Sequence, residues 1–224
     1  SEMAARQAGG WYGLTPNKLH VVRNGVDCER FRPDVTLRSE ARRRWGVPKH
    51  GRVALFLGNG FRRKGLATAV KAFHRVAHAS DRFVIVGGRD SYAARYLRPL
   101  RQLLGDQMIV VGPTLAPELA FVGADATVMP TRYDSAANTT IESMACGVAV
   151  VTSVYDGNAE LIADKRLVVS DPRNEKEVAN SLLCAWDYTN AQREVLRNSV
   201  MEWTIERNGV MMERIYQRLL DDRG

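Results

Sequence analysis

The sequence predicts an α/β protein whose strands form one doubly wound parallel sheet with helices on both faces. Two observations favour this fold class. From about Gly51 onward, short apolar runs rich in β-branched residues alternate with longer segments of helical periodicity. The short runs are apolar on both faces, which is typical of parallel strands between two layers of helices. The 224 residues, 45% of them hydrophobic, are enough to bury a core of ordinary size.

The individual elements follow from these runs in chain order. We expect strands at residues 53–57, 83–86, 108–111, 126–129, 149–152 and 167–169. Helices are expected at 65–79, 92–104, 116–122, 138–145, 159–163 and 176–188, with two more between 192 and 220 around Trp203. Asp171-Pro172 marks a helix start, and Gly105 and Gly147 stand where helices should stop.

The first 50 residues do not fit this pattern. They hold a helical piece at 1–7, a turn at 15–17, one strand candidate at 19–22 and an Asn24-Gly25 turn. A single strand without a partner suggests the end of a preceding domain. We therefore expect three parts: the end of an N-terminal domain with a connecting segment (1–50), the sheet domain (51–200) and a C-terminal helix (201–224).

Composition restricts the partners and the location. The formal net charge of +7 favours an anionic partner, such as a phosphate-bearing ligand or an acidic lipid. Few aromatic residues lie among the basic ones, so no nucleic acid is expected. The sequence shows neither a bilayer-spanning run nor a secretion signal, which predicts a cytoplasmic protein. The three cysteines form no CxxC pair, and His74 and His78 lack a third ligand, so no metal site is expected.

A first candidate site lies between the first core strand and its helix, where doubly wound sheets bind ligands. Glycines allow a close approach of the backbone, and the cations and helix-start amides attract an anion such as a diphosphate. A solvated turn with incidental basic residues explains the loop equally well. The loop matches neither a Walker A loop nor a GxGxxG motif. Its candidate binding residues are Gly58, Asn59, Gly60, Arg62, Arg63 and Lys64.

A second candidate site lies at residues 134–142, where small residues precede a helix. Its backbone amides suit a phosphate or a sugar hydroxyl, and the carboxylates Asp134 and Glu142 flank them as acceptors for paired hydroxyls. The alternative makes Asp134 or Ser135 a helix cap and Glu142 a surface residue, and spacing alone favours that alternative. The candidate binding residues between the two acids are Ser135, Ala136, Ala137, Asn138 and Thr139.

Five strings in fixed order extend these patterns: HVVRNGVDCERFRP, FLGNGFRRKG, FVIVGG, FVGADATVMPTRYDS and IESMACGVAVVTS. Together they resemble the C-terminal, donor-binding domain of family 4 retaining glycosyltransferases, so the sheet is expected to be Rossmann-like and one half of a GT-B fold. The run from Asp134 to Gly147 is similar to bacterial lipopolysaccharide-core sugar transferases.

The resemblance also implies roles for residues. The family's pair of acids falls on Asp134 and Glu142, with Asp where the family usually has Glu, and Glu142 is expected to hold the ribose. The phosphate-binding pair falls on Arg63 and Lys64, with Arg62 as a substitute. These four residues, Asp134, Glu142, Arg63 and Lys64, are the expected catalytic residues. The nucleobase is expected near Gly112, Pro113 and Thr114.

The implied reaction moves a sugar from a nucleotide-diphosphate donor to an acceptor hydroxyl with retention of configuration. A UDP-sugar is favoured over a GDP- or ADP-sugar, and neither a metal nor a cofactor is expected. The acceptor, a lipopolysaccharide, another glycan or a lipid-linked molecule, would bind an absent N-terminal domain, with peripheral contact to the inner face of the plasma membrane. The 224 residues alone are therefore expected to be inactive. A nucleotide-sugar 2-epimerase, a non-catalytic nucleotide-binding homologue and, more weakly, a basic nucleic-acid-binding domain remain alternatives.

Overall fold

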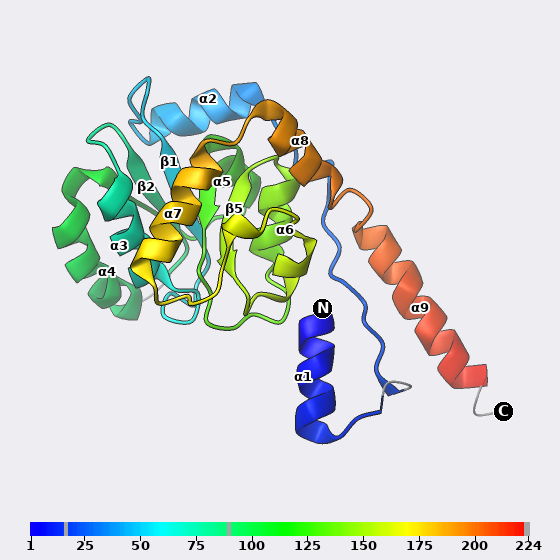
Figure 1. The fold of residues 1–224 in the computed structure, drawn as a ribbon. Coiled ribbons are helices and arrows are strands. Elements are labelled where there is room, and N and C mark those ends of the chain that lie inside the picture. The colour runs from blue at the N-terminus through cyan, green and yellow to red at the C-terminus, as the bar shows by residue number, and fades with distance from the viewer. Residues whose placement is uncertain (16–17, 89–90, 222–224) are drawn as a thin grey trace.

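The computed structural model describes residues 1–15, 18–88 and 91–221, and a parallel sheet forms its centre (Figure 1). Its six strands lie in the order β3-β2-β1-β4-β5-β6 and pair in parallel. All six strand predictions are confirmed to within one residue at each end. The order reverses between β1 and β4, which makes the sheet doubly wound. The strands are β1 Val53–Leu57, β2 Arg82–Val86, β3 Met108–Gly112, β4 Ala126–Val128, β5 Ala149–Ser153 and β6 Val168–Val169.

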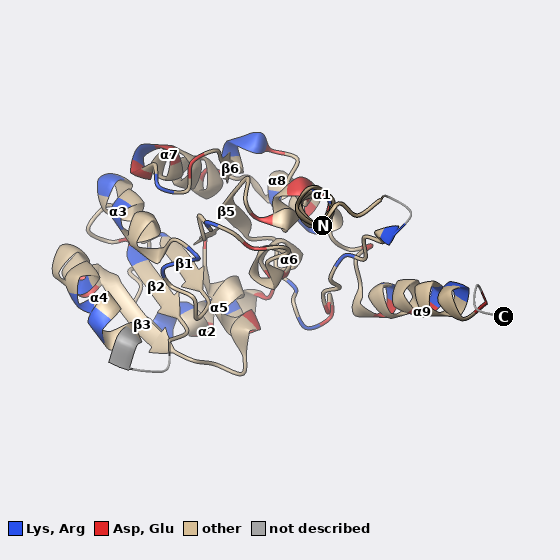
Figure 2. Ribbon diagram, turned by 90° about the horizontal axis from the view of Figure 1, so that it is seen from below, with Lys and Arg blue, Asp and Glu red and all other residues tan. Residues whose placement is uncertain are grey.

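Helices cover both faces of the sheet, as the sequence predicts (Figure 2). One layer contains α3, α4 and α7, and the other contains α2, α5 and α6, with α8 packed on α6. Aromatic side chains such as Phe73 and Phe83, whose ring centroids lie 5.3 Å apart, fill the space between helices and sheet. The helices are α2 Val35–Arg44, α3 Leu66–Val76, α4 Ser91–Leu104, α5 Pro117–Gly123, α6 Asn138–Ala145, α7 Glu175–Trp186 and α8 Asn190–Asn198, with short 3-10 helices η2 Gly105–Gln107, η3 Gly157–Leu161 and η4 Lys165–Leu167.

Two helices project from this body (Figure 1). Helix α1 spans Glu2–Tyr12 and is longer than the predicted 1–7, and α9 spans Ile205–Asp221 and has no fully buried residue. The prediction of two helices around Trp203 is confirmed by α8 and α9. No helix in the described ranges is both long enough and apolar enough to cross a bilayer.

Several predictions for the first 50 residues are wrong. Residues 19–22 form no strand, because no neighbouring strand in the described structure offers them a ladder of hydrogen bonds. Asn24 and Gly25 form no turn, since the Val26 N–H donates to the Trp203 carbonyl (2.9 Å) and the chain runs beside α9. A Cβ on Gly25 would collide with the backbone of Thr204, so this glycine permits a close approach. The predicted turn at 15–17 falls on residues 16 and 17, which lie outside the described ranges.

The helix prediction at 159–163 is wrong in type, because residues 157–161 form the 3-10 helix η3. Its hydrogen bonds join residues three apart, as from the Ala159 N–H to the Asp156 carbonyl (2.9 Å), and such helices rarely exceed one turn. The predicted stops at Gly105 and Gly147 are confirmed, since both residues adopt the left-handed conformation with φ of 54° and 69°.

Candidate functional site

The two candidate loops meet at the point where the strand order reverses. The loop after β1 contains Arg63 and Lys64, and the loop after β4 contains Asp134; both leave the carboxyl ends of adjacent strands. The Arg132 N–H donates to the Arg63 carbonyl (2.8 Å), which joins the loops directly. Doubly wound sheets bind ligands at this position because connections that diverge to opposite sides leave a crevice between them.

A cluster of opposite charges lies where the loops meet. The Arg63 guanidinium and the Lys64 amine lie 2.9 Å and 3.4 Å from the same carboxylate oxygen, Oδ2 of Asp134. The Lys64 and Asp134 side chains are only 12% and 16% exposed, whereas the Arg63 side chain is half exposed. The aliphatic part of Lys64 passes close to Gly58, where a Cβ would lie 2.7 Å from the lysine Cδ. Gly58 therefore makes room for the cation to reach the site.

The start of α6 presents unsatisfied amides beside this cluster. Its N-cap is Ala137, whose methyl group cannot accept a hydrogen bond from the helix N–H groups. Neither Asp134 nor Ser135 therefore acts as the cap. Within the described structure no protein acceptor faces the backbone N–H groups of Asn138 and Thr139. Free amides at the positive end of a helix attract anions and polarised hydroxyls. The geometry thus favours the binding interpretation of the segment over the cap.

The start of α6 is held by Asp156, a residue that was not among the predicted site residues. This residue is buried, and its Oδ2 accepts hydrogen bonds from the hydroxyls of Thr140 (2.5 Å) and Thr152 (3.0 Å). Its Oδ1 accepts from the N–H groups of Ala137 (3.2 Å) and Asn158 (3.0 Å). Burial raises the pKa of Asp156, and these four bonds oppose that rise. An Asp-Gly pair in sequence indicates only a turn, so no local signal distinguishes this residue.

Glu142 lies one turn into α6 and is half-buried, not a surface residue. Burial raises the pKa of its carboxyl, while the charges of Arg30 and Lys64 lower it. The described chain provides no hydrogen-bond donor to this carboxylate, although buried carboxylates are normally bonded. An unpaired acceptor of this kind beside a loop cluster is a candidate ligand contact.

Arg30, whose charge acts on the pKa of the Glu142 carboxyl, is bonded to the segment after β3. Its guanidinium donates to the Leu115 carbonyl (2.7 Å) and pairs with Glu118 (2.8 Å). Arg30 lies in the first of the five motif strings, but no pattern in the sequence indicates a role for it. Its position shows that the segment before α2 contributes to the electrostatics around Glu142.

Of the remaining predicted residues in the loop after β1, Gly60 accepts a hydrogen bond from the Lys64 N–H (2.8 Å). Asn59 accepts from the Gly88 N–H (3.0 Å), which ties the loop after β1 to the loop after β2. Gly112, with φ of 81°, accepts from the Gly87 N–H (2.8 Å), and Pro113 and Thr114 beyond it are exposed. The Arg62 side chain is exposed and forms no ion pair or hydrogen bond within the described ranges.

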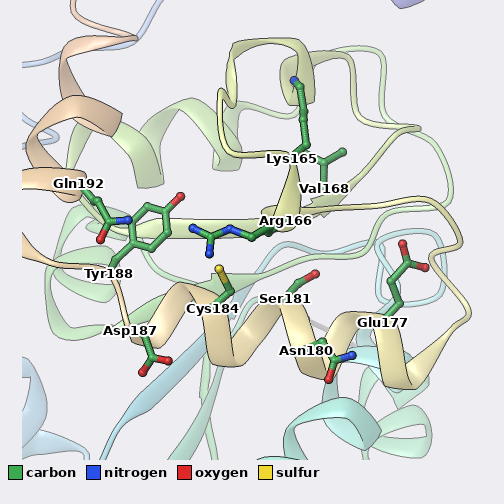
Figure 3. Close-up of a pocket in the computed structure, with 10 residues that line it drawn as sticks. All are labelled: Lys165, Arg166, Val168, Glu177, Asn180, Ser181, Cys184, Asp187, Tyr188 and Gln192. Carbon is green, nitrogen blue, oxygen red and sulfur yellow. The ribbon is translucent and has the colours of Figure 1, made fainter.

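A cavity of about 580 Å³ lies elsewhere, between β6, α7 and α8 (Figure 3). Its two cations already have partners: Arg166 pairs with Asp164 (2.7 Å), and Lys165 donates to the Ile162 carbonyl (2.7 Å). The hydrogen bonds from Arg166 and Tyr188 lower the pKa of Asp164 to about 2. No predicted site residue lines this cavity. Among the described residues there is also no group of three or more His, Cys, Asp or Glu side chains that could hold a metal ion.

Comparison with known proteins places this geometry in a family. Residues 51–187 match the family model described as "Glycosyl transferases group 1". The chain is 33% identical over 181 residues to the D-inositol 3-phosphate glycosyltransferase of Acidothermus cellulolyticus, an alignment that covers 71% of this chain and 40% of the relative. The chain thus spans about two fifths of that relative's length.

Solved structures show the same fold. The structure of Anabaena HepE in complex with UDP and glucose superposes with a TM-score of 0.83 at 17% identity, covering 96% of this chain and 61% of HepE. WaaG, a glycosyltransferase involved in lipopolysaccharide biosynthesis, gives a TM-score of 0.72 at 17% identity over 87% of this chain and 54% of its own. The predicted Rossmann-like half of a GT-B fold is confirmed.

Proposed function

The chain belongs to the glycosyl transferases group 1 family, and on that premise we propose that it binds a nucleotide-sugar donor at the loops after β1 and β4. One observation carries the proposal: two cations, a row of free helix-start amides and an unpaired half-buried carboxylate converge at the switch point of the sheet. This set matches the charges and hydroxyls of a nucleotide sugar. HepE, whose structure holds UDP and glucose, supports a UDP-sugar as the donor.

Each part of the donor has a partner in this arrangement. Arg63, Lys64 and the amides of Asn138 and Thr139 bind the diphosphate, and the Glu142 carboxylate accepts from the paired hydroxyls of the ribose. The nucleobase lies against the backbone of Gly112 to Thr114. As the sugar leaves, negative charge builds on the diphosphate, and fixed cations and amides stabilise it. Sugar transfer with retention then needs no metal and no protein-bound intermediate at these residues.

Thermal denaturation with a panel of nucleotide sugars tests the donor site. A donor that binds only the folded chain at about 100 times its Kd should add about 2.7 kcal/mol of stability. We expect UDP-sugars to raise the melting temperature more than GDP- or ADP-sugars do. Lys64→Ala should abolish the shift, whereas Lys165→Ala, in the cavity of Figure 3, should retain it. A panel without any shift would refute donor binding, and a shift lost only in Lys165→Ala would move the site to that cavity.

The acceptor is proposed to bind outside these 224 residues. The Acidothermus relative is named for D-inositol 3-phosphate and WaaG for lipopolysaccharide biosynthesis, so a polyhydroxylated acceptor, either small or part of a lipid-linked glycan, is proposed for the longer protein. The basic net charge of +7 suits peripheral contact with an acidic membrane. Incubating the longer protein and the 224-residue chain with donor and each acceptor should give transfer only with the longer protein.

A further inference from the structure

The Asp134 carboxylate pairs with both cations that the proposed donor site offers to a diphosphate. Both cations of the site converge on its Oδ2, at 2.9 Å for Arg63 and 3.4 Å for Lys64. Its Oδ1 has no hydrogen-bond partner within the described structure. Because this one oxygen receives both cations, each of them is already paired in the ligand-free protein, and the single carboxylate cancels one of their two positive charges.

Only the side chain of Asp134 is free to move. Its backbone N–H donates to the Tyr155 carbonyl (2.9 Å), and its own carbonyl accepts from the Gly157 N–H (2.9 Å). These two bonds fix the main chain beside the segment of Asp156. A rotation about the two side-chain bonds, without any change in the loop, therefore suffices to release the cations.

We propose that Asp134 is a specificity-determining residue that exchanges places with the donor's diphosphate, so that the site prefers a diphosphate bearing a sugar over a bare one. The inference rests on the proposed donor site. A carboxylate and a diphosphate repel each other and compete for Arg63 and Lys64, so any diphosphate must first displace Asp134. The displaced carboxylate then lies next to an anion and needs a hydrogen-bond donor.

The attached sugar provides that donor through its hydroxyl groups, which can give hydrogen bonds to the released carboxylate. The ionised oxygens of a bare diphosphate only accept hydrogen bonds, so they offer Asp134 no partner. The cost of displacement is thus recovered only by the sugar-bearing ligand. Discrimination arises from the penalty on the wrong ligand, not from an added contact to the diphosphate.

A purely supporting role for Asp134 makes the opposite prediction. If its carboxylate only held Arg63 and Lys64 in position, its removal would disorder the cations and weaken the binding of every diphosphate. Exchange predicts tighter binding of bare diphosphates after removal. The sign of the change in affinity therefore separates the two roles.

Calorimetric titration of the 224-residue chain with inorganic pyrophosphate, UDP and UDP-glucose tests the exchange. Asp134→Asn and Asp134→Ala should bind pyrophosphate and UDP about three- to tenfold more tightly than the wild type, as expected for the loss of two competing ion pairs. UDP-glucose should gain less, so that the ratio of its affinity to that of UDP falls. Two different substitutions are used so that a contact made by the new asparagine, or a gap left by alanine, is not mistaken for the effect of removing the carboxylate.

Glu175→Gln is the matched control. Glu175 likewise pairs with one lysine and one arginine, Lys71 (3.0 Å) and Arg75 (3.3 Å), but it lies at the start of α7. Its removal changes the net charge equally and should leave all three affinities unchanged. An equal gain in Glu175→Gln would show a general charge effect and overturn the exchange.

The outcomes also separate this inference from the proposed function. Unchanged or weaker binding of pyrophosphate and UDP in both Asp134 variants would overturn the exchange while leaving the donor site intact. A wild type that binds neither UDP nor UDP-glucose, although the variants bind pyrophosphate more tightly, would refute the donor site and retain the competition at the cations. Absence of binding of pyrophosphate, UDP and UDP-glucose in every variant would refute both.

Discussion

At the scale of single residues, Glu142 shows a conflict between stability and function. Burial raises the pKa of its carboxyl, so the folded chain holds this proton more tightly than the unfolded chain does. The folded state therefore loses stability as the pH rises from the ordinary pKa of a glutamate through the raised one. At neutral pH an ionised, half-buried carboxylate without a donor destabilises the ligand-free protein.

Glu142→Gln should accordingly melt at a higher temperature than the wild type at neutral pH, because glutamine has no charge to desolvate. The difference should disappear when the pH falls below the ordinary pKa of glutamate, where both chains are neutral at this position. Melting curves across this pH range check the prediction. Glu175→Gln provides a control of opposite sign, since the hydrogen bond from Lys71 lowers the pKa of Glu175 and its loss should destabilise at neutral pH. A pH-independent difference in melting temperature for Glu142→Gln would contradict the interpretation that the buried charge of Glu142 destabilises the folded chain.

At the scale of elements, the junction between β1 and α3 depends on Gly65. This residue is the N-cap of α3 and adopts φ of 78°, a conformation that favours glycine. A Cβ there would also collide with the carbonyl oxygen of Pro130, in the loop after β4. The close contact of the two loops that carry the site therefore requires a residue without a side chain.

Gly65→Ala should destabilise the protein by clearly more than the about 1–2 kcal/mol that a left-handed conformation costs alanine alone. Gly105→Ala isolates that conformational cost, because Gly105 has φ of 54° and no atom within 4 Å of its ideal Cβ. Urea unfolding of both variants measures the difference. Equal losses of the free energy of unfolding would show that the contact between Gly65 and the Pro130 carbonyl does not exclude a side chain at position 65.

At the scale of the whole molecule, the sheet domain and the projecting helices differ in how they are stabilised. Helix α9 has no fully buried residue, and α1 buries only Met3. Helix α8, in contrast, buries Leu196, and the Arg193 side chain donates to the Asp125 carbonyl at 3.1 Å. Because burial of apolar surface dominates stability, the body should not depend on α9.

A chain that ends after Thr204 should retain the free energy of unfolding of the full chain to within about 1 kcal/mol. A chain that ends after Tyr188 should lose several kcal/mol, because it lacks the buried Leu196 and Val200, and burial of such side chains contributes roughly 1.5–3 kcal/mol each. Urea unfolding followed by circular dichroism compares the two. A large loss on removal of α9 alone would mean that the helix stabilises the sheet domain.

The sequence predicts most of the fold and about half of the arrangement at the site. The strands and α6 were predictable because the spacing of apolar residues and a glycine at the end of a helix are local features that can be read from neighbouring residues. The strand at 19–22 was wrong because a strand exists only where a neighbour supplies hydrogen bonds, and local pattern does not specify a neighbour. Asp156 was missed for the same reason, since three of its four hydrogen-bond partners come from the start of α6 and from β5, which only the fold brings beside it.

The sequence by itself determined the fold class, the family resemblance and the two loops that carry the candidate residues, because each is encoded in short runs of neighbouring residues. Only the tertiary structure decided that Asp134 pairs with Arg63 across 71 positions of the chain. It also decided that the first N–H groups of α6 have no protein acceptor, and that the half-buried Glu142 carboxylate has no hydrogen-bond donor within the described residues. Charge pairing and desolvation depend on which segments the sheet brings together, so they are properties of the assembled fold.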